Sequence, residues 1–372
     1  METCDIGSLP FDGDLERYLK SARPIDPSYG LLYPSKIEEA QRYFDEKVVE
    51  TFIQKVGVGI DVPNYPQFRD MNKMFLDAFT GIERTPQGYV AIDSIGVKPE
   101  EAEILEVAVL KRHAKEIVEK TGSPLRLKVC VTGPYTLASM LKERRADTFL
   151  SIADGISKIV QANIFNGKYG GVRLLFVDEP LFGLVDDPLL DFGQKGRENL
   201  LRAWEHVLEV VSIKEVNRGF HLHSTRDGLF WDVKSLEILE SHVNDPLYES
   251  SSTKEKLERT DKFIKASITV TDFDALIRRR LTNEAKCIDE STLNEKVGET
   301  WKEIGKNLVD PLDFLEEVEI MRKRLKTLVS LFGKERVPYA GPECGLRGFP
   351  TLESAMELLR RVTESAHNPN GT

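Results

Sequence analysis

Eight short apolar runs alternate with longer amphipathic stretches along this chain, and the alternation restricts the folds that the sequence can adopt. Several runs carry β-branched or aromatic residues, and most end in Gly, Pro, Asp or Ser, as strands commonly do. The intervening stretches have apolar residues at helical spacing. The predicted strands are Thr3–Leu9, Gly57–Pro63, Leu125–Gly133, Val172–Glu179, Gly219–Ser224, Pro246–Ser251, Ile264–Thr271 and Val337–Cys344.

Alternating strands and helices predict an α/β fold with a parallel sheet, and eight such units predict a closed (β/α)8 TIM barrel whose first and last strands adjoin. An open doubly wound sheet is the alternative, but no G-x-G-x-x-G turn follows the first predicted strand. The charged segment 272–307 reads as a helical insertion between strands 7 and 8. No low-complexity linker divides residues 1–372, so we expect one barrel domain.

Composition excludes several classes of function. The net charge is −10 and no basic patch is present, which argues against nucleic-acid binding. No run reaches the roughly 18 apolar residues of a membrane span. The N-terminus does not resemble a signal peptide, so a cytoplasmic location is expected. Four widely spaced cysteines make no disulfide framework. Cys4 and Cys130 lie inside apolar runs, where core packing is predicted.

Polar side chains stand at or near the ends of five predicted strands, which is where a barrel gathers its chemistry. They come from strands 1, 4, 5, 6 and 8 and are far apart in sequence. They are Ser8, Asp178, Glu179, His221, His223, Glu249 and Cys344.

His221 and His223 form the sharpest local pattern. Residues two apart on a strand face the same side, so the two imidazoles converge. The pair alone is more typical of hydrogen-bonded core or surface histidines than of metal ligands. With Glu249 on the next predicted strand and Cys344 two strands further, the set predicts a metal site. Nitrogen and thiolate ligands suit zinc better than magnesium or calcium.

Asp178 and Glu179 leave several roles open. They could form a general acid/base pair, bind the ammonium of an amino-acid substrate, or cap a helix. Neighbours on a strand face opposite ways, so both reach one site only if the strand has ended. Cys344 could likewise be an inert buried thiol, although its Gly-Pro-Glu-Cys-Gly-Leu-Arg setting indicates an exposed turn.

Six motifs in order along nearly the whole chain resemble the cobalamin-independent methionine synthases, specifically their C-terminal catalytic barrel. GPECGLRG and VDEP are fairly specific, whereas TGPYTLASM is shared with related barrels that include uroporphyrinogen decarboxylase. The motifs are IGSLP at 6–10, TGPYTLASM at 132–140, VDEP at 177–180, FHLHS at 220–224, YESS at 248–251 and GPECGLRG at 341–348.

The resemblance implies a cytoplasmic enzyme that uses zinc to methylate the thiol of homocysteine, giving methionine. The implied zinc ligands are His221, His223, Glu249 and Cys344, with Glu249 also able to leave when the thiol arrives. Ser8 and Asp178 match the family's homocysteine contacts, and Asp178 would orient the substrate amine. The methyl donor would be a methylated folate or a methylated corrinoid, the latter carried by a corrinoid protein.

Three departures qualify what the resemblance implies. His223 replaces a family cysteine, which makes the metal site less negative by one charge. Asn64 stands where the family has a second amine-binding carboxylate, so another thiol such as coenzyme M is an alternative substrate. The chain also lacks the N-terminal barrel that helps bind folate in longer enzymes. A metal-free decarboxylase and a non-catalytic methyltransferase relative are the remaining alternatives.

Overall fold

The computed structural model describes residues 1–22, 34–211, 213, 215–285 and 288–368. It divides into two compact units: unit 1 is Met1–Phe68, Ala266–Ser330 and Tyr339–Thr372, and unit 2 is Arg69–Lys265 and Leu331–Pro338. The chain has an α/β fold in which parallel strands form a curled sheet, as the alternation predicts. Within the described ranges, no helix combines the length and apolarity needed to cross a membrane.

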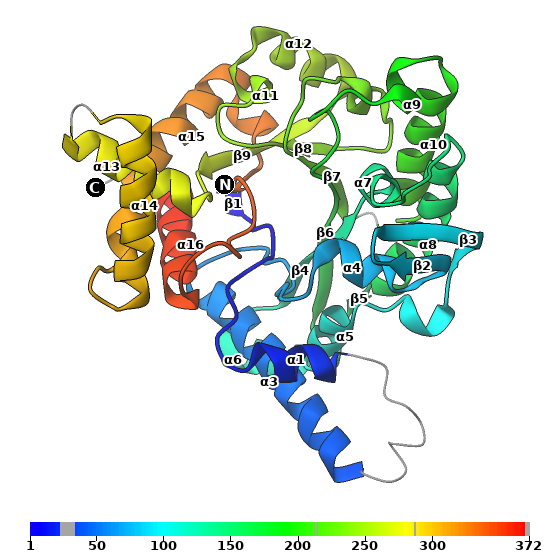
Figure 1. Cartoon of the computed structure of the whole chain (residues 1–372), viewed down its shortest axis with the longest axis horizontal. Coiled ribbons are helices and arrows are strands. Elements are labelled where there is room, and N and C mark those ends of the chain that lie inside the picture. Colours follow the sequence, from blue (N-terminus) through cyan, green and yellow to red (C-terminus); the bar gives the residue numbers. More distant parts are fainter. Residues whose placement is uncertain (23–33, 212, 214, 286–287, 369–372) are drawn as a thin grey trace. The chain divides into compact units, whose positions relative to one another are not determined.

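Unit 2 carries a run of parallel strands in the order β4, β6, β7, β8 and the first residues of β9. Their cores are apolar and fully buried, which fits strands covered on both faces. Figure 1 shows α8 and α10 side by side next to these strands. The strands are β4 (Leu125–Thr132), β6 (Gly170–Glu179), β7 (Asn217–Leu222), β8 (Ile238–Glu240) and β9 (Phe263–Thr269), with the short β5 (Asn166–Gly167) antiparallel to β6.

The helices of unit 2 fill the intervals between these strands. They are α4 (Met71–Leu76), η1 (Pro99–Glu101), α5 (Leu105–Arg112), α6 (Ala114–Thr121), α7 (Pro134–Ser139), α8 (Thr148–Asn163), α9 (Pro188–Asp191), α10 (Lys195–Glu209), η2 (Leu229–Asp232), α11 (Pro246–Glu249), α12 (Ser251–Thr260) and η4 (Lys334–Arg336). A hairpin of β2 (Phe79–Thr85) and β3 (Gly88–Val97), which turns at Pro86 and Gln87, occupies a stretch to which the sequence patterns assign no element.

In unit 1 the first and last strands adjoin, as a barrel requires. β1 (Glu2–Thr3) pairs in parallel with β10 (Tyr339–Pro342), and Cys4 continues the pairing by donating to Ala340. The other elements are α1 (Leu15–Ser21), α3 (Pro34–Gly57), α13 (Phe273–Ala285), α14 (Glu290–Gly305), η3 (Pro311–Phe314), most of α15 (Val318–Phe332) and α16 (Leu352–His367). The described part of segment 272–307 therefore contains two helices, α13 and α14. Full closure of a (β/α)8 barrel stays a prediction.

Two predicted strands differ from the structure. The prediction of a strand at 246–251 is wrong, because Asp245 accepts a hydrogen bond from the Leu247 amide and Pro246 occupies the first turn, which together start helix α11. The sixth strand expected from the sequence is instead β8, which begins eight residues earlier, at Ile238. In the predicted run 57–63, only an isolated parallel bridge between Cys4 and Val62 forms.

A buried carboxylate joins three elements of unit 1. Glu316 accepts hydrogen bonds from Arg324 at 2.5 and 2.8 Å, from the Thr269 hydroxyl and Val270 amide at 3.0 Å each, and also from Arg279. Burial alone would raise the pKa of Glu316, but the hydrogen bonds and charge of Arg324 outweigh it and lower that pKa. The charged carboxylate therefore stabilises the folded state.

We expect Glu316→Gln to lower the free energy of unfolding by about 3 kcal/mol at pH 7, because it leaves a largely buried arginine without its counter-charge. The folded pKa lies below the unfolded one. The loss should therefore be complete above roughly pH 4.5 and should shrink as the pH falls through the folded pKa. Urea unfolding at several pH values measures it. Glu319→Gln, at an exposed ion pair on α15, should cost less than about 1 kcal/mol.

Candidate metal centre

Three histidines meet where β7 and β8 end in unit 2. His221 lies on β7, His223 follows that strand, and His242 lies two residues beyond β8. Their ring centroids are 5.2, 6.1 and 4.2 Å apart for the pairs 221–223, 221–242 and 223–242. One nitrogen of each ring lies within 4.8 Å of a nitrogen of the other two. The convergence predicted for His221 and His223 is therefore present, and a third imidazole joins them.

The electrostatics of the cluster favour the neutral imidazole at His221 and at His223, which is the form that binds metal. Burial, reinforced by the neighbouring His221 and His242, lowers the pKa of His223 to about 2. Burial also lowers the pKa of His221, against the opposing effect of Glu240. Nε2 of His242 is buried and has no hydrogen-bond partner within the described part of the chain. The imidazole nitrogens of this cluster therefore have lone pairs that suit a metal ion.

Glu240 fixes the orientation of His221. Its carboxylate lies 2.8 Å from Nδ1 of His221, 2.6 Å from Nζ of Lys265 and 3.9 Å from Nζ of Lys128, and all four side chains are buried. Burial would raise the pKa of Glu240, but the two lysines outweigh it and hold that pKa well below its ordinary value. A hydrogen bond from Nδ1 to this carboxylate leaves Nε2 of His221 as the metal-binding nitrogen.

Strand register puts Asp178 beside the histidines. Asp178 on β6 is the partner of His221 on β7, and His221 is the partner of Glu240 on β8, so the three form a row across the sheet. Burial raises the pKa of Asp178 to about 7, opposed by Lys128 and reinforced by Glu240. Its Oδ1 atom has no hydrogen-bond partner among the residues described. A buried carboxylate in this state is available to a cationic ligand group.

Glu179, the neighbour of Asp178, has a structural role. It accepts hydrogen bonds from the amides of Tyr135 and Thr136 at 2.9 and 2.7 Å, and from the Trp204 indole at 2.7 Å. It therefore accepts hydrogen bonds from the first free amides of α7, which is a helix-capping role, as one alternative predicted. The capped helix is the one that follows β4 and not the one that follows Glu179 itself. Adjacent strand residues face opposite ways, which leaves Asp178 alone on the histidine side.

Glu249 is not part of this cluster. It is the last residue of α11 and is exposed, because the Asp245–Pro246 pair turns the chain into a helix there. His242 and Glu240 are not predicted from the sequence for the same reason, because the sixth strand is expected at 246–251. A signal was present: Glu240 and His242 follow the apolar pair Ile238–Leu239 with the same two-residue spacing as His221 and His223.

The remaining candidates lie in unit 1. Cys344 is partly exposed just after β10, and the next residue, Gly345, approaches Ser8 so closely that a Cβ there would lie 1.8 Å from the serine Oγ. The Leu346 amide also donates to the Ser8 carbonyl at 2.8 Å. Asn64 is fully buried, and its side chain donates to the Tyr65 carbonyl at 3.1 Å.

The two other described cysteines pack as predicted. Cys4 and Cys130 are fully buried within unit 1 and unit 2 respectively. Neither is partly exposed as Cys344 is, so the described thiols differ in their access to a ligand. This difference agrees with core packing for the two and with the exposed turn expected at Cys344.

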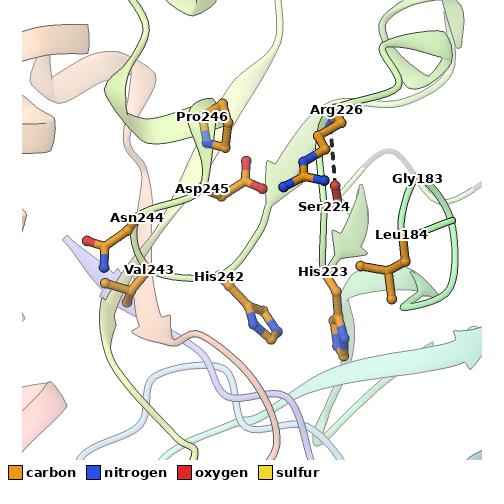
Figure 2. A pocket seen from close by; sticks show the side chains of 10 residues that line it. All are labelled: Gly183, Leu184, His223, Ser224, Arg226, His242, Val243, Asn244, Asp245 and Pro246. Carbon is orange, nitrogen blue, oxygen red and sulfur yellow. Dashed lines mark hydrogen bonds between the residues drawn. The ribbon is translucent and has the colours of Figure 1, made fainter. Parts of the chain in front are cut away.

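A cavity of about 290 Å³ adjoins the histidines in unit 2. Loops that follow β6, β7 and β8 form its wall, and His223 and His242 both line it (Figure 2). The carboxyl ends of parallel strands are where barrels and open α/β sheets bind small molecules. The candidate metal centre thus has a space beside it that suits a small ligand.

Similarity to known proteins agrees with the motifs. The chain is 23% identical over 367 residues to a methionine synthase from Sulfolobus acidocaldarius, a match that covers 97% of this chain and 90% of that protein. No protein-family model matches the chain.

Solved structures share the fold. A B12-independent methionine synthase from Shewanella sp. W3-18-1, solved with selenomethionine, has a TM-score of 0.59 at 12% identity and covers 98% of this chain and 96% of its own. A putative vitamin-B12 independent methionine synthase from Listeria monocytogenes has a TM-score of 0.59 at 13% identity and full coverage of both chains. The resemblance inferred from the motifs is thereby confirmed.

Proposed function

We propose that this chain, which resembles the cobalamin-independent methionine synthases along nearly its whole length, is a zinc-dependent methyltransferase that acts on the thiol of homocysteine. The observation that carries the proposal is the histidine cluster. Three imidazoles converge at the ends of β7 and β8, and a buried nitrogen of His242 has no partner among the described residues. Metal chemistry explains such a cluster better than packing does.

His221, His223 and His242 would hold the metal, and we propose Cys344 as the thiolate that completes the set. Imidazole suits zinc, copper, iron and nickel, and the addition of a thiolate favours zinc. Zinc would lower the pKa of a bound thiol and so supply the nucleophilic thiolate at neutral pH. With three imidazoles and one thiolate the site carries one negative charge from its ligands, and this low charge favours thiol deprotonation.

The protein groups around the cluster would position the substrate. Asp178, with its buried Oδ1 atom and a pKa of about 7, is suited to bind the substrate ammonium, whose charge would favour the ionised carboxylate. Ser8 is proposed to contact the substrate carboxylate. Asn64 stays a predicted substrate contact. The methyl donor is proposed to be a methylated folate or a corrinoid protein.

Alkyl transfer to another small thiol is the second candidate, and the residue at position 64 favours it. Asn64 has no charge to bind a substrate ammonium, and its backbone amide and carbonyl are engaged by Asp5 and Lys55. With Asp178 as the one carboxylate proposed for the amine, coenzyme M and homocysteine should be compared directly as acceptors. Methylation of coenzyme M alone would select this candidate.

We expect the purified protein to contain one zinc ion per chain by elemental analysis. Removal of that zinc with a chelator should abolish methylation of homocysteine, because a free thiol is mostly protonated at neutral pH. Added Zn²⁺ should restore it. Methyl transfer from methyltetrahydrofolate and from methylcobalamin should be assayed in parallel. A protein without bound metal, or one whose turnover survives complete zinc removal, contradicts the proposal.

A further inference from the structure

The cavity beside the histidines is lined by one arginine, Arg226, which the proposed reaction does not use. Arg226 lies in the loop after β7, three residues beyond His223. Figure 2 shows its side chain among the groups that line the cavity, with its backbone amide held by Ser224 Oγ at 3.4 Å. Its guanidinium makes no hydrogen bond or ion pair with any residue that the structure describes.

The carboxylates nearest to Arg226 in sequence or in the cavity wall are engaged elsewhere. Asp227 forms two hydrogen bonds with Arg197, both 2.7 Å long, and accepts a third from the Leu229 amide. Asp245 accepts from the amides of Thr225 and Leu247 at 3.1 and 2.8 Å, and from the Thr225 hydroxyl. Arg226 is therefore the positive charge that the cavity offers to a ligand.

We propose that Arg226 binds the anionic group of the small thiol whose sulfur lies at the histidine cluster, an inference that rests on the proposed function. The planar guanidinium donates paired hydrogen bonds to a carboxylate or a sulfonate, and a cavity of about 290 Å³ accommodates a thiol of a few heavy atoms. A serine hydroxyl such as Ser8 adds one hydrogen bond but no charge. The substrate class is thus a short thiol that ends in an oxyanion.

Calorimetric binding to the zinc-loaded protein tests this without a methyl donor. The probes are homocysteine, 2-mercaptoethanesulfonate and the neutral 2-mercaptoethanol, each titrated into wild type, Arg226→Gln and Arg226→Lys. Arg226→Gln should weaken binding of the anionic thiol roughly tenfold to a hundredfold, the size expected for a charged hydrogen bond, and leave 2-mercaptoethanol unchanged. The affinity of Arg226→Lys for the anionic thiol should fall between those of wild type and Arg226→Gln. Arg202→Gln, at an exposed arginine on α10, is the matched control.

The outcomes separate this inference from the proposed function. Whichever anionic thiol loses affinity in Arg226→Gln identifies the substrate as a carboxylate or a sulfonate. Equal affinity of the wild type for charged and neutral thiols, or an equal loss of both in Arg226→Gln, overturns the role of Arg226. A wild type that binds no zinc contradicts the proposed function instead. In that case binding of the anionic thiols to the metal-free protein, with and without Arg226, decides the inference.

Discussion

His242→Ala should lose its zinc and at least a hundredfold of its methyltransfer activity, whereas Glu249→Ala should keep both. A change to the side chains behind a metal ligand already costs roughly 10–100-fold in metal affinity, and removal of a ligand costs more. Nε2 of His242 is buried beside His223, while Glu249 is exposed on α11. The two variants therefore distinguish the cluster seen in the structure from the ligand set implied by the motifs.

Zinc stoichiometry and a competition titration with a chromophoric chelator measure this effect. Thermal unfolding of both variants without metal provides the control for folding. The loss of zinc affinity in His242→Ala, expressed as a free energy, must exceed any change in the stability of the metal-free protein. If His242→Ala retains one zinc per chain and Glu249→Ala loses it, the assignment from the structure is wrong and the ligand implied by the motifs is restored.

Glu240→Gln should have the second largest effect, on both stability and metal binding. It removes the negative charge that lies between Lys265 and Lys128, two fully buried lysines. Loss of one partner from a buried ion pair costs about 3–5 kcal/mol. The weaker hydrogen bond to His221 Nδ1 should also lower zinc affinity about tenfold or more.

Urea unfolding and the zinc titration measure the two effects separately. Glu237→Gln is the matched control, because Glu237 lies next to β8 and pairs with Arg218 at a partly exposed position. Its cost should stay below about 1 kcal/mol. The double variant Glu240→Gln/Lys265→Met should recover part of the lost stability, since it removes one of the two buried positive charges that Glu240 faces. A single variant as stable as wild type would show that Glu240 is not held as a carboxylate.

Much of the sheet could be predicted because its strands are apolar on both faces. β4, β6, β7 and β9 coincide with predicted runs, since β-branched and aromatic residues fill them and their short length is typical of buried strands. β8 was missed because it has only three residues, too few for any periodicity. The strand predicted at 246–251 falls instead on α11, which the pair Asp245–Pro246 starts.

The part of the candidate site that could be predicted from the sequence is the part that lies along a single strand. His221 and His223 share a strand and a face, so their convergence follows from local geometry. The contribution of His242 depends on β7 and β8 being neighbours, and that of Glu240 on buried lysines from β4 and β9. Such tertiary neighbours leave no periodic pattern in the sequence. Asp178 is an intermediate case. The VDEP motif identifies it as a candidate site residue, but only the pairing of β6 with β7 places it beside His221.

The register of β6, β7 and β8 has a consequence for how this protein can change. Asp178, His221 and Glu240 form their row through backbone pairing, so the insertion or deletion of one residue within a strand would turn those side chains to the opposite face. The loops that line the cavity begin only after the strands end, and they tolerate changes in length. Directed evolution toward a different thiol should therefore accumulate insertions and substitutions at 183–184, 224–226 and 243–246. The strands that carry the row would stay constant.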